Sequence, residues 1–260
     1  DYYHDLMLTK ASDRKHQELE KKVLHFADAV VSAGKTMSDE FASIAGNTAK
    51  TKLRVISNGY DDDDLPKAKI PLSKKFTITH AGTLVRTRNP VSLWKSLSEM
   101  IEENQRFADD LEIVLAGKAD VSVNESLKNS GLEKFVSRKG YVSHEDAVKL
   151  LASSQVLLLV LNDTPNAKGI LTGKLFEYLS SRRPILAIGP EDGDAAEIIN
   201  ECQAGMTVNF QSADKMKQTI AEFYRQFKSG SVECKSTGIE KYSRKALTGK
   251  LTELLNQISQ

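Results

Sequence analysis

This sequence of 260 residues has few cysteines, no long apolar run and almost no net charge. Its two cysteines, Cys202 and Cys234, are far apart and lack the spacing of a metal site, which indicates a reducing compartment. The longest apolar run, Val156 to Leu161, is too short to cross a membrane. A formal net charge of +1 excludes a general attraction to nucleic acid or to an anionic membrane. Any bound anion must therefore meet a local group of donors.

Several common catalytic and nucleotide-binding motifs are also absent. A P-loop needs GxxxxGK followed by Ser or Thr, but here Gly169 is only four residues before Gly173, and Lys174 is followed by Leu175. A dinucleotide fingerprint needs GxGxxG at the first βα turn, where this chain has the single Gly82. HExxH, a zinc cluster and GxSxG are missing as well. We therefore expect no metal and no NAD or FAD cofactor.

From Phe76 onward, short apolar runs alternate with amphipathic helical stretches. Strands are expected at Phe76 to Ala81, Leu111 to Ala116, Val136 to Tyr141, Val156 to Leu161, Pro184 to Ile188 and Met206 to Asn209. Helices are expected at Val91 to Arg106, Val123 to Ser130, His144 to Ser153, Lys174 to Ser181, Asp194 to Glu201 and Ala213 to Phe227. This alternation predicts an α/β fold, a Rossmann-like parallel sheet with helices on both faces, whose ligand lies beyond the carboxyl ends of the strands.

The sequence before Phe76 is too short for a second complete αβ domain. Residues 1–57 contain apolar segments around 28–34 and 53–56 with a helix between them, and they resemble the end of such a domain. Residues 58–75 hold an Asn-Gly turn signal and four successive aspartates, which predicts a linker. Residues 76–240 form the αβ domain, and 241–260 form an amphipathic helix that packs across its surface. Because the chain opens without methionine, we expect a fragment or processed form.

The most informative stretch is residues 168–187, KGILTGKLFEYLSSRRPILA. Lys174 and Glu177 are three residues apart and share one helix face. Thr172 can cap that helix, and Gly173 lets backbone amides approach a ligand, so the helix start favours a phosphate. Lys174 adds a positive charge, and Glu177 can accept hydrogen bonds from two neighbouring sugar hydroxyls. The combination suits a nucleotide sugar; the alternative is an amphipathic helix with solvated charges.

Three further turns fall on the same edge of the expected sheet. Gly82 lets a ligand approach the backbone, and Arg86 or Arg88 can grip a diphosphate; the alternative is a tight turn with exposed arginines. Gly117 closes a second strand and is more typical of simple turn chemistry. Tyr141 ends another strand, where its ring or a free backbone amide can meet a nucleobase, although such a tyrosine is commonly just packed.

Taken in order, these junctions resemble the carboxyl-terminal half of a family 4 retaining glycosyltransferase with the two-domain GT-B architecture, over about residues 54–255. KLFEYL with RPILA is the most specific element, and RVISNGYD, FTITHAGTLVRTRNP, LEIVLAGK, VSRKGYVSHEDAVKLLASSQVLLLVL and YSRKAL follow the family's order. The resemblance implies that residues 1–57 are a remnant of the amino-terminal, acceptor-side domain. It also implies that residues 76–240 are the nucleotide-sugar donor domain.

The resemblance also implies roles for individual residues. Arg88 and Lys174 would stabilise the leaving diphosphate and count as catalytic. The substrate would be bound by Gly82, Thr83, Tyr141, Val142, Thr172, Gly173, Leu175 and Glu177. In that set Glu177 would hold the ribose hydroxyls, the Tyr141–Val142 backbone would read the base, and the remaining residues would line the phosphates.

One position departs from the family pattern. Many members carry a second glutamate eight residues before the ribose-binding one, and this chain has Gly169 there. Backbone amides, or Lys168 and Asn166, would then have to recognise the donor's sugar hydroxyls.

We therefore expect a cytoplasmic glycosyltransferase of polysaccharide or lipid-linked precursor synthesis. It would use a UDP-, GDP- or ADP-linked sugar and a glycan or lipid-linked acceptor, with retention and without a cofactor. The chain would bind the donor but not transfer the sugar alone, and any peripheral membrane contact would lie in the missing domain. The alternatives are a nucleotide-sugar epimerase of the same architecture, with His80 as its only local histidine, and a non-catalytic module that binds a nucleotide sugar or a protein.

Overall fold

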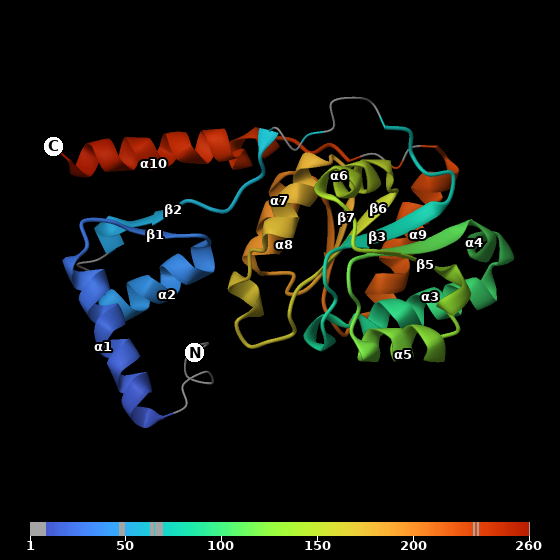
Figure 1. The fold of residues 1–260 in the computed structure, drawn as a ribbon, viewed down its shortest axis with the longest axis horizontal. Coiled ribbons are helices and arrows are strands. Elements are labelled where there is room, and N and C mark those ends of the chain that lie inside the picture. Colours follow the sequence, from blue (N-terminus) through green and yellow to red (C-terminus); the bar gives the residue numbers. More distant parts are fainter. Residues whose placement is uncertain are drawn as a thin grey trace.

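The computed structural model describes residues 9–46, 50–62, 65, 70–230, 232 and 234–259. Parts of the expected amino-terminal remnant (1–8 and 47–49) and of the expected linker (63–64 and 66–69) lie outside the described residues. Figure 1 shows an αβ domain with a smaller segment beside it, formed by the first part of the chain. The carboxyl-terminal helix lies next to that segment.

A six-stranded parallel sheet forms the centre of the αβ domain. Its strands are β3 (Phe76–Ala81), β4 (Leu111–Ala116), β5 (Val136–Gly140), β6 (Val156–Val160), β7 (Ile185–Ile188) and β8 (Gly205–Val208). They lie in the order β5-β4-β3-β6-β7-β8, and every neighbouring pair is parallel. The predicted fold class is confirmed.

Helices cover both faces of this sheet. One face packs against α3 (Val91–Glu103), α4 (Gln105–Asp110), α5 (Val121–Asn129) and α9 (Ala213–Lys228). The other packs against α6 (His144–Ser153), α7 (Gly173–Ser180) and α8 (Asp194–Glu201). Leu158 of β6 joins the first core, whereas Leu157 and Leu159 join the second. Since both faces are buried, the strand reads as a continuous apolar run.

Short 3-10 turns connect several of these elements. They are η3 (Arg86–Arg88), η4 (Glu133–Phe135), η5 (Ala167–Gly169) and η6 (Ile239–Tyr242). The helix expected at 91–106 is divided at Asn104, whose side chain accepts hydrogen bonds from the amides of Arg106 and Phe107. The cap on α4 therefore overrides the continuous helical periodicity. In the same way, Asp120 caps α5 and starts it two residues earlier than predicted.

The segment before the αβ domain contains α1 (Lys10–Phe26), β1 (Val30–Ser32), α2 (Lys35–Ala45), η1 (Lys50–Lys52) and β2 (Leu53–Val55). β1 and β2 form a two-stranded parallel sheet. Apolar side chains of α1 are exposed, including Phe26 at 76%. No helix within the described ranges has the length and apolar character that a membrane crossing requires.

The carboxyl-terminal helix α10 (Arg244–Ile258) begins where the chain meets Tyr60. The Tyr60 amide donates to the Tyr242 carbonyl at 3.1 Å, and the Arg244 amide donates to the Tyr60 carbonyl at 2.8 Å. Ser243 caps the helix through the Ala246 amide. We expected this helix to pack across the surface of the αβ domain, whereas in Figure 1 it extends away from that domain.

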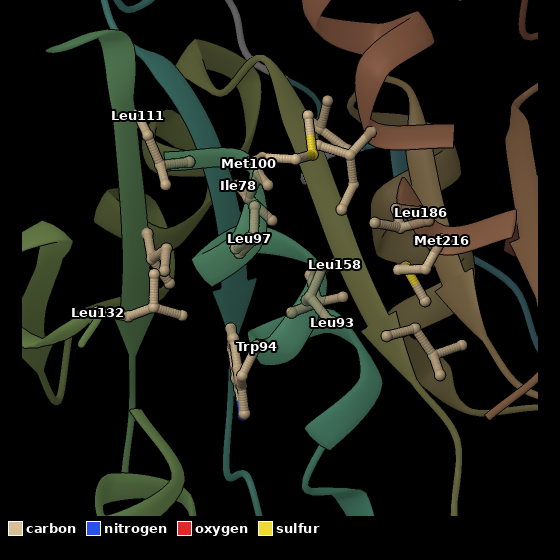
Figure 2. Packing of buried hydrophobic residues seen from close by; sticks show 14 of the residues in the cluster. Ile78, Leu93, Trp94, Leu97, Met100, Leu111, Leu132, Leu158, Leu186 and Met216 are labelled. Atoms are coloured by element: carbon tan, nitrogen blue, oxygen red, sulfur yellow. The ribbon is translucent and has the colours of Figure 1, made fainter. Parts of the chain in front are cut away.

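A substitution of Leu97 in α3 tests the packing of the core between the sheet and helices α3, α4, α5 and α9. The Leu97 side chain is 0% exposed and lies among Ile78, Leu93 and Met100 (Figure 2). Leu97→Ala should lower the free energy of unfolding by about 2–5 kcal/mol, because it removes buried methyl groups and leaves a cavity. Urea denaturation measures this loss. Val121→Ala, at a side chain 69% exposed, should change the free energy of unfolding by less than about 0.5 kcal/mol. Equal losses in the two variants would contradict the placement of Leu97 in the buried core.

Candidate functional site

The strand order of the sheet reverses between β3 and β6. From β3 the chain proceeds outward to β4 and β5, then returns to the other side of β3 and proceeds to β7 and β8. In open α/β sheets, ligands bind at this reversal, outside the carboxyl ends of the strands. β3 and β6 pair at Ile78↔Val156 and Thr79↔Leu157 only. Beyond Thr79 the two strands stop pairing, and side chains fill the space between them.

The buried side chains of Tyr178 and His80 connect β3 to β6, because both bond the Leu158 carbonyl of β6. The Tyr178 hydroxyl accepts a hydrogen bond from the Ala81 amide at 3.0 Å and donates to the Leu158 carbonyl at 3.4 Å. Nδ1 of His80 lies 2.9 Å from the same carbonyl. Burial raises the pKa of Tyr178 well above its usual value, so its hydroxyl keeps the proton that it donates. Tyr178 and His80 therefore fix the last residues of β3 relative to β6.

His80 is a neutral histidine in this environment. The side chain is 2% exposed, and burial lowers its pKa to about 4. The hydrogen bond to Leu158 opposes that decrease, whereas the nearby Lys174 and Arg88 add to it. A carbonyl only accepts, so we assign the ring proton of the neutral histidine to Nδ1, which donates to the Leu158 carbonyl. Nε2 has no hydrogen-bond partner within the described residues.

The Gly82 turn follows β3 directly and packs against Lys174. Gly82 has φ +117°, and a Cβ placed there would lie 2.2 Å from Lys174 Cε. Gly117, after β4, has φ +119°, and its own Cβ would lie 2.5 Å from the Gly82 carbonyl oxygen. Both positions therefore favour glycine, because φ is positive at each. At Gly117 the Gly82 backbone also leaves no space for a side chain. Two of the turns singled out in the sequence meet here.

Two basic side chains converge above this turn. Nε of Arg88 donates to Asn162 Oδ1 at 2.7 Å, just after the end of β6. Burial and the charge of Arg88 lower the pKa of the half-buried Lys174, while Glu177 opposes the shift. Arg86 is exposed, so of the two arginine candidates Arg88 is the one held near Lys174. Two partly desolvated cations that repel each other form a favourable place for an anion.

The start of α7 differs in detail from the prediction. Thr172 is the N-cap residue, but its side chain makes no capping bond, and its Oγ1 is buried without a partner in the described part of the chain. The Leu175 amide donates to the Thr172 carbonyl at 3.1 Å and is not available to a ligand. The role that the resemblance gives Leu175, lining the phosphates, therefore cannot come from its amide. The helix begins at Gly173, one residue earlier than expected.

Two amides do remain at this helix start. Those of Gly173 and Lys174 have no hydrogen-bond acceptor among the residues described. A Cβ at Gly173 would meet no atom within 4 Å, so the surface above it is open. Free amides, the positive end of the helix dipole and Lys174 thus act on the same side of α7.

The remaining predicted residues lie on the surface around these groups. Glu177 and Thr83 are exposed, Val142 is half-buried, and Tyr141 is 97% exposed and not packed. Sequence reasoning missed an apolar groove between α6 and α7, with Glu177 at its edge. Its walls include Tyr60, Ala147, Val148, Leu151 and Ser180. Within the described ranges, no group of three His, Cys, Asp or Glu side chains is placed to hold a metal.

Sequence reasoning also missed Asn162 and Tyr178. Asn162 directly follows an apolar strand, and its place at the same sheet edge was the available signal. Tyr178 is one of the buried side chains of α7. Nothing in the sequence indicates that its hydroxyl reaches across to the Ala81 amide, 97 residues away.

Residues 75–226 match the protein family described as Glycosyl transferases group 1. This match covers more than half of the chain. The chain belongs to this family. A comparison with curated proteins found no match.

Solved structures share the fold. HepE from Anabaena in complex with UDP superposes with a TM-score of 0.71 at 16% identity, covering 90% of this chain and 65% of HepE. The same protein with UDP and glucose gives 0.69 at 15% identity, covering 90% and 64%. A glycosyltransferase from Rickettsia africae gives 0.72 at 17% identity, covering 94% and 67%. The chain thus spans about two thirds of the length of these structures, and its α/β fold matches that of GT-B glycosyltransferases.

Tyr178→Phe tests the bridge between β3 and β6. Removal of the hydroxyl leaves the buried Ala81 amide without its acceptor, so the free energy of unfolding should fall by about 1–3 kcal/mol. Urea denaturation measures the change. Tyr141→Phe removes the same atom from a side chain that is 97% exposed and should be nearly neutral. A Tyr178→Phe protein as stable as the wild type would show that the bridge does not hold the strands.

The buried His80 also predicts a pH dependence of stability. Its pKa falls from 6.5 to about 4 on folding, so the unfolded chain binds more protons as the pH drops below 6.5. This histidine alone should cost about 2 kcal/mol of stability between pH 7.5 and pH 5. His80→Asn keeps a donor for the Leu158 carbonyl but cannot titrate. Its denaturation midpoint should fall less over that range, with a constant offset from wild type above pH 7; parallel profiles would contradict the assignment.

Proposed function

We propose that this chain is the donor-binding part of a glycosyltransferase that moves a sugar, with retention, from a nucleotide sugar to a glycan or lipid-linked acceptor in the cytoplasm. The observation that carries the proposal is the convergence of Lys174 and Arg88 on the Gly82 turn, beside the free amides of α7. All four features lie at the edge of the sheet where its strand order reverses. Membership of the group 1 family and the likeness to a UDP-bound structure support it.

The chemistry requires stabilisation of a leaving diphosphate. As the bond to the anomeric carbon breaks, negative charge grows on the departing phosphate oxygen. Lys174 and Arg88 provide two positive charges there, and the Gly173 and Lys174 amides provide two fixed donors. Because these groups are already oriented, little reorganisation is needed when the charge develops. The diphosphate also removes the repulsion between the two cations, which strengthens its binding.

The nucleoside would lie along the exposed side of α7. Glu177 is one turn beyond the phosphate donors, and its exposed carboxylate can accept bonds from the ribose hydroxyls. The base would then extend toward the Tyr141–Val142 backbone. The apolar groove between α6 and α7 begins at Glu177 and gives this end of the site a partly apolar wall.

The two alternative functions, a nucleotide-sugar epimerase and a non-catalytic binding module, require different features of the chain. An epimerase would need a histidine that reaches the sugar, but His80 is 2% exposed and its Nδ1 is bound to the Leu158 carbonyl. A non-catalytic module would keep the nucleotide site and lack transfer even as part of a complete two-domain protein. We propose that this chain binds the donor but does not transfer the sugar alone, since an acceptor site would have to be built mostly from residues beyond it.

Calorimetric titration of the chain with UDP, GDP and ADP tests the site. One of them should bind, and Lys174→Met or Glu177→Gln should each weaken binding by at least about tenfold, because each removes a charge-assisted contact. The matched controls are Lys15→Met and Glu18→Gln. These residues form an exposed pair on α1 with the same three-residue spacing, 3.2 Å between the charged groups. The controls should bind like the wild type.

Two results would overturn the proposal. The first is that none of the three nucleotides releases or absorbs heat in the titration. The second is that Glu177→Gln and Glu18→Gln bind with the same affinity, which would leave the ribose contact without support.

A further inference from the structure

A single carboxylate joins the first segment of the chain to the αβ domain. Asp194, the first residue of α8, lies 158 positions from Thr36 in the first turn of α2. The Thr36 amide donates to both carboxylate oxygens of Asp194, at 3.2 and 3.1 Å, and the Thr36 hydroxyl donates to Oδ1 at 2.7 Å. Asp194 is 6% exposed, so these bonds are largely screened from water.

Asp194 takes the place of a helix cap for α2. The N-cap residue of α2 is Gly34, which has no side chain to accept a bond from the first turn. A Cβ at Gly34 would lie 2.2 Å from Asp194 Oδ2, so no capping side chain fits there while Asp194 is in position. The carboxylate accepts from the α2 amide and also lies at the start of its own helix, α8. The starts of two helices therefore meet at this one side chain.

The loop that leads into α7 is held between the same two helices. A Cβ at Gly169, at the end of η5, would lie 3.3 Å from Thr36 Cγ2. A Cβ at Gly193, just before α8, would lie 2.9 Å from the Lys168 carbonyl oxygen. The backbone of η5 thus touches α2 on one side and α8 on the other. Only three residues separate Gly169 from Gly173, where α7 begins.

We propose that Asp194 is a positioning residue for the donor site. By capping α2 it holds Thr36 against η5, and this contact fixes the short connection to the free amides of α7. The inference rests on the proposed nucleotide site, because those amides are its phosphate donors. Asp194 acts through Thr36 and the loop and does not itself touch the donor.

The same geometry gives a reason for Gly169. A Cβ at this position would lie 3.3 Å from Thr36 Cγ2 and 3.4 Å from Thr36 Cβ, so a side chain here would press on the start of α2. The absence of a carboxylate at residue 169 and the presence of one at Asp194 are therefore parts of one arrangement. In it, the start of α2 occupies the space that a side chain at residue 169 would need.

Asp194→Asn and Thr36→Val test this inference in the full chain, with two readouts. Amide hydrogen exchange, followed by NMR, reports the Thr36 bond without any nucleotide. Calorimetry reports the Kd of UDP, GDP or ADP, whichever binds the wild type most tightly. Asp194→Asn should speed exchange at Thr36 by at least about tenfold and raise the nucleotide Kd by about three- to tenfold. Thr36→Val, which loses the hydroxyl bond to Asp194, should also raise the Kd. Thr36→Ser keeps that hydroxyl and lacks only Cγ2, so its Kd should lie closer to wild type than that of Thr36→Val.

Glu197→Gln is the matched control, because it changes the same charge on an exposed residue of α8, one turn further on. It should leave both readouts at the wild-type values. Faster Thr36 exchange with an unchanged nucleotide Kd would overturn the positioning role and leave only a structural contact. Unchanged exchange would show that the cap itself is wrong. If wild type binds none of the nucleotides, the proposed function fails, while the exchange readout still tests the cap. If Asp194→Asn does not fold, Thr36→Val and Thr36→Ser carry the same comparison.

Discussion

The candidate site depends on how β3 and β6 are held apart at the reversal of strand order. Parallel neighbours normally stay paired through backbone hydrogen bonds, and here pairing stops after Thr79. The Ala81 amide and the Leu158 carbonyl, which would otherwise lack partners, are satisfied by Tyr178, and His80 shares the carbonyl. Because buried backbone groups are costly when unpaired, this bridge holds the last residue of β3 in place beside β6. The Gly82 turn follows that residue directly, and its amide bonds the Ala116 carbonyl of β4.

The electrostatics of the site follow from that position. The Gly82 turn packs against the stem of Lys174, and Arg88 is oriented by Asn162. Burial and the nearby charge of Arg88 lower the pKa of Lys174. A protein gains nothing in stability from such a pair without an anion. An arrangement that weakens the unliganded state in this way is typical of functional sites.

The segment before the αβ domain contributes to the site through Asp194. Gly34, Gly169 and Gly193 allow three backbone segments to approach closely around one buried carboxylate. The phosphate end of α7 is thus connected, through η5, to a helix that lies outside the αβ domain. The proposed role of Asp194 couples the position of that first segment to the geometry of the donor site.

The sequence alone determined the local and periodic features. Apolar runs and helical periodicity identified the six strands and most helix boundaries, because burial on both faces of a parallel sheet leaves a direct pattern. It also identified Gly82, Lys174 and Glu177 as candidates, because turn and helix chemistry are local. Only the tertiary structure decided which arginine lies near Lys174, and that Tyr178, Asn162 and Asp194 support the site. These contacts join residues 74 to 158 positions apart. Such pairings depend on how the elements pack in space, which no local pattern records.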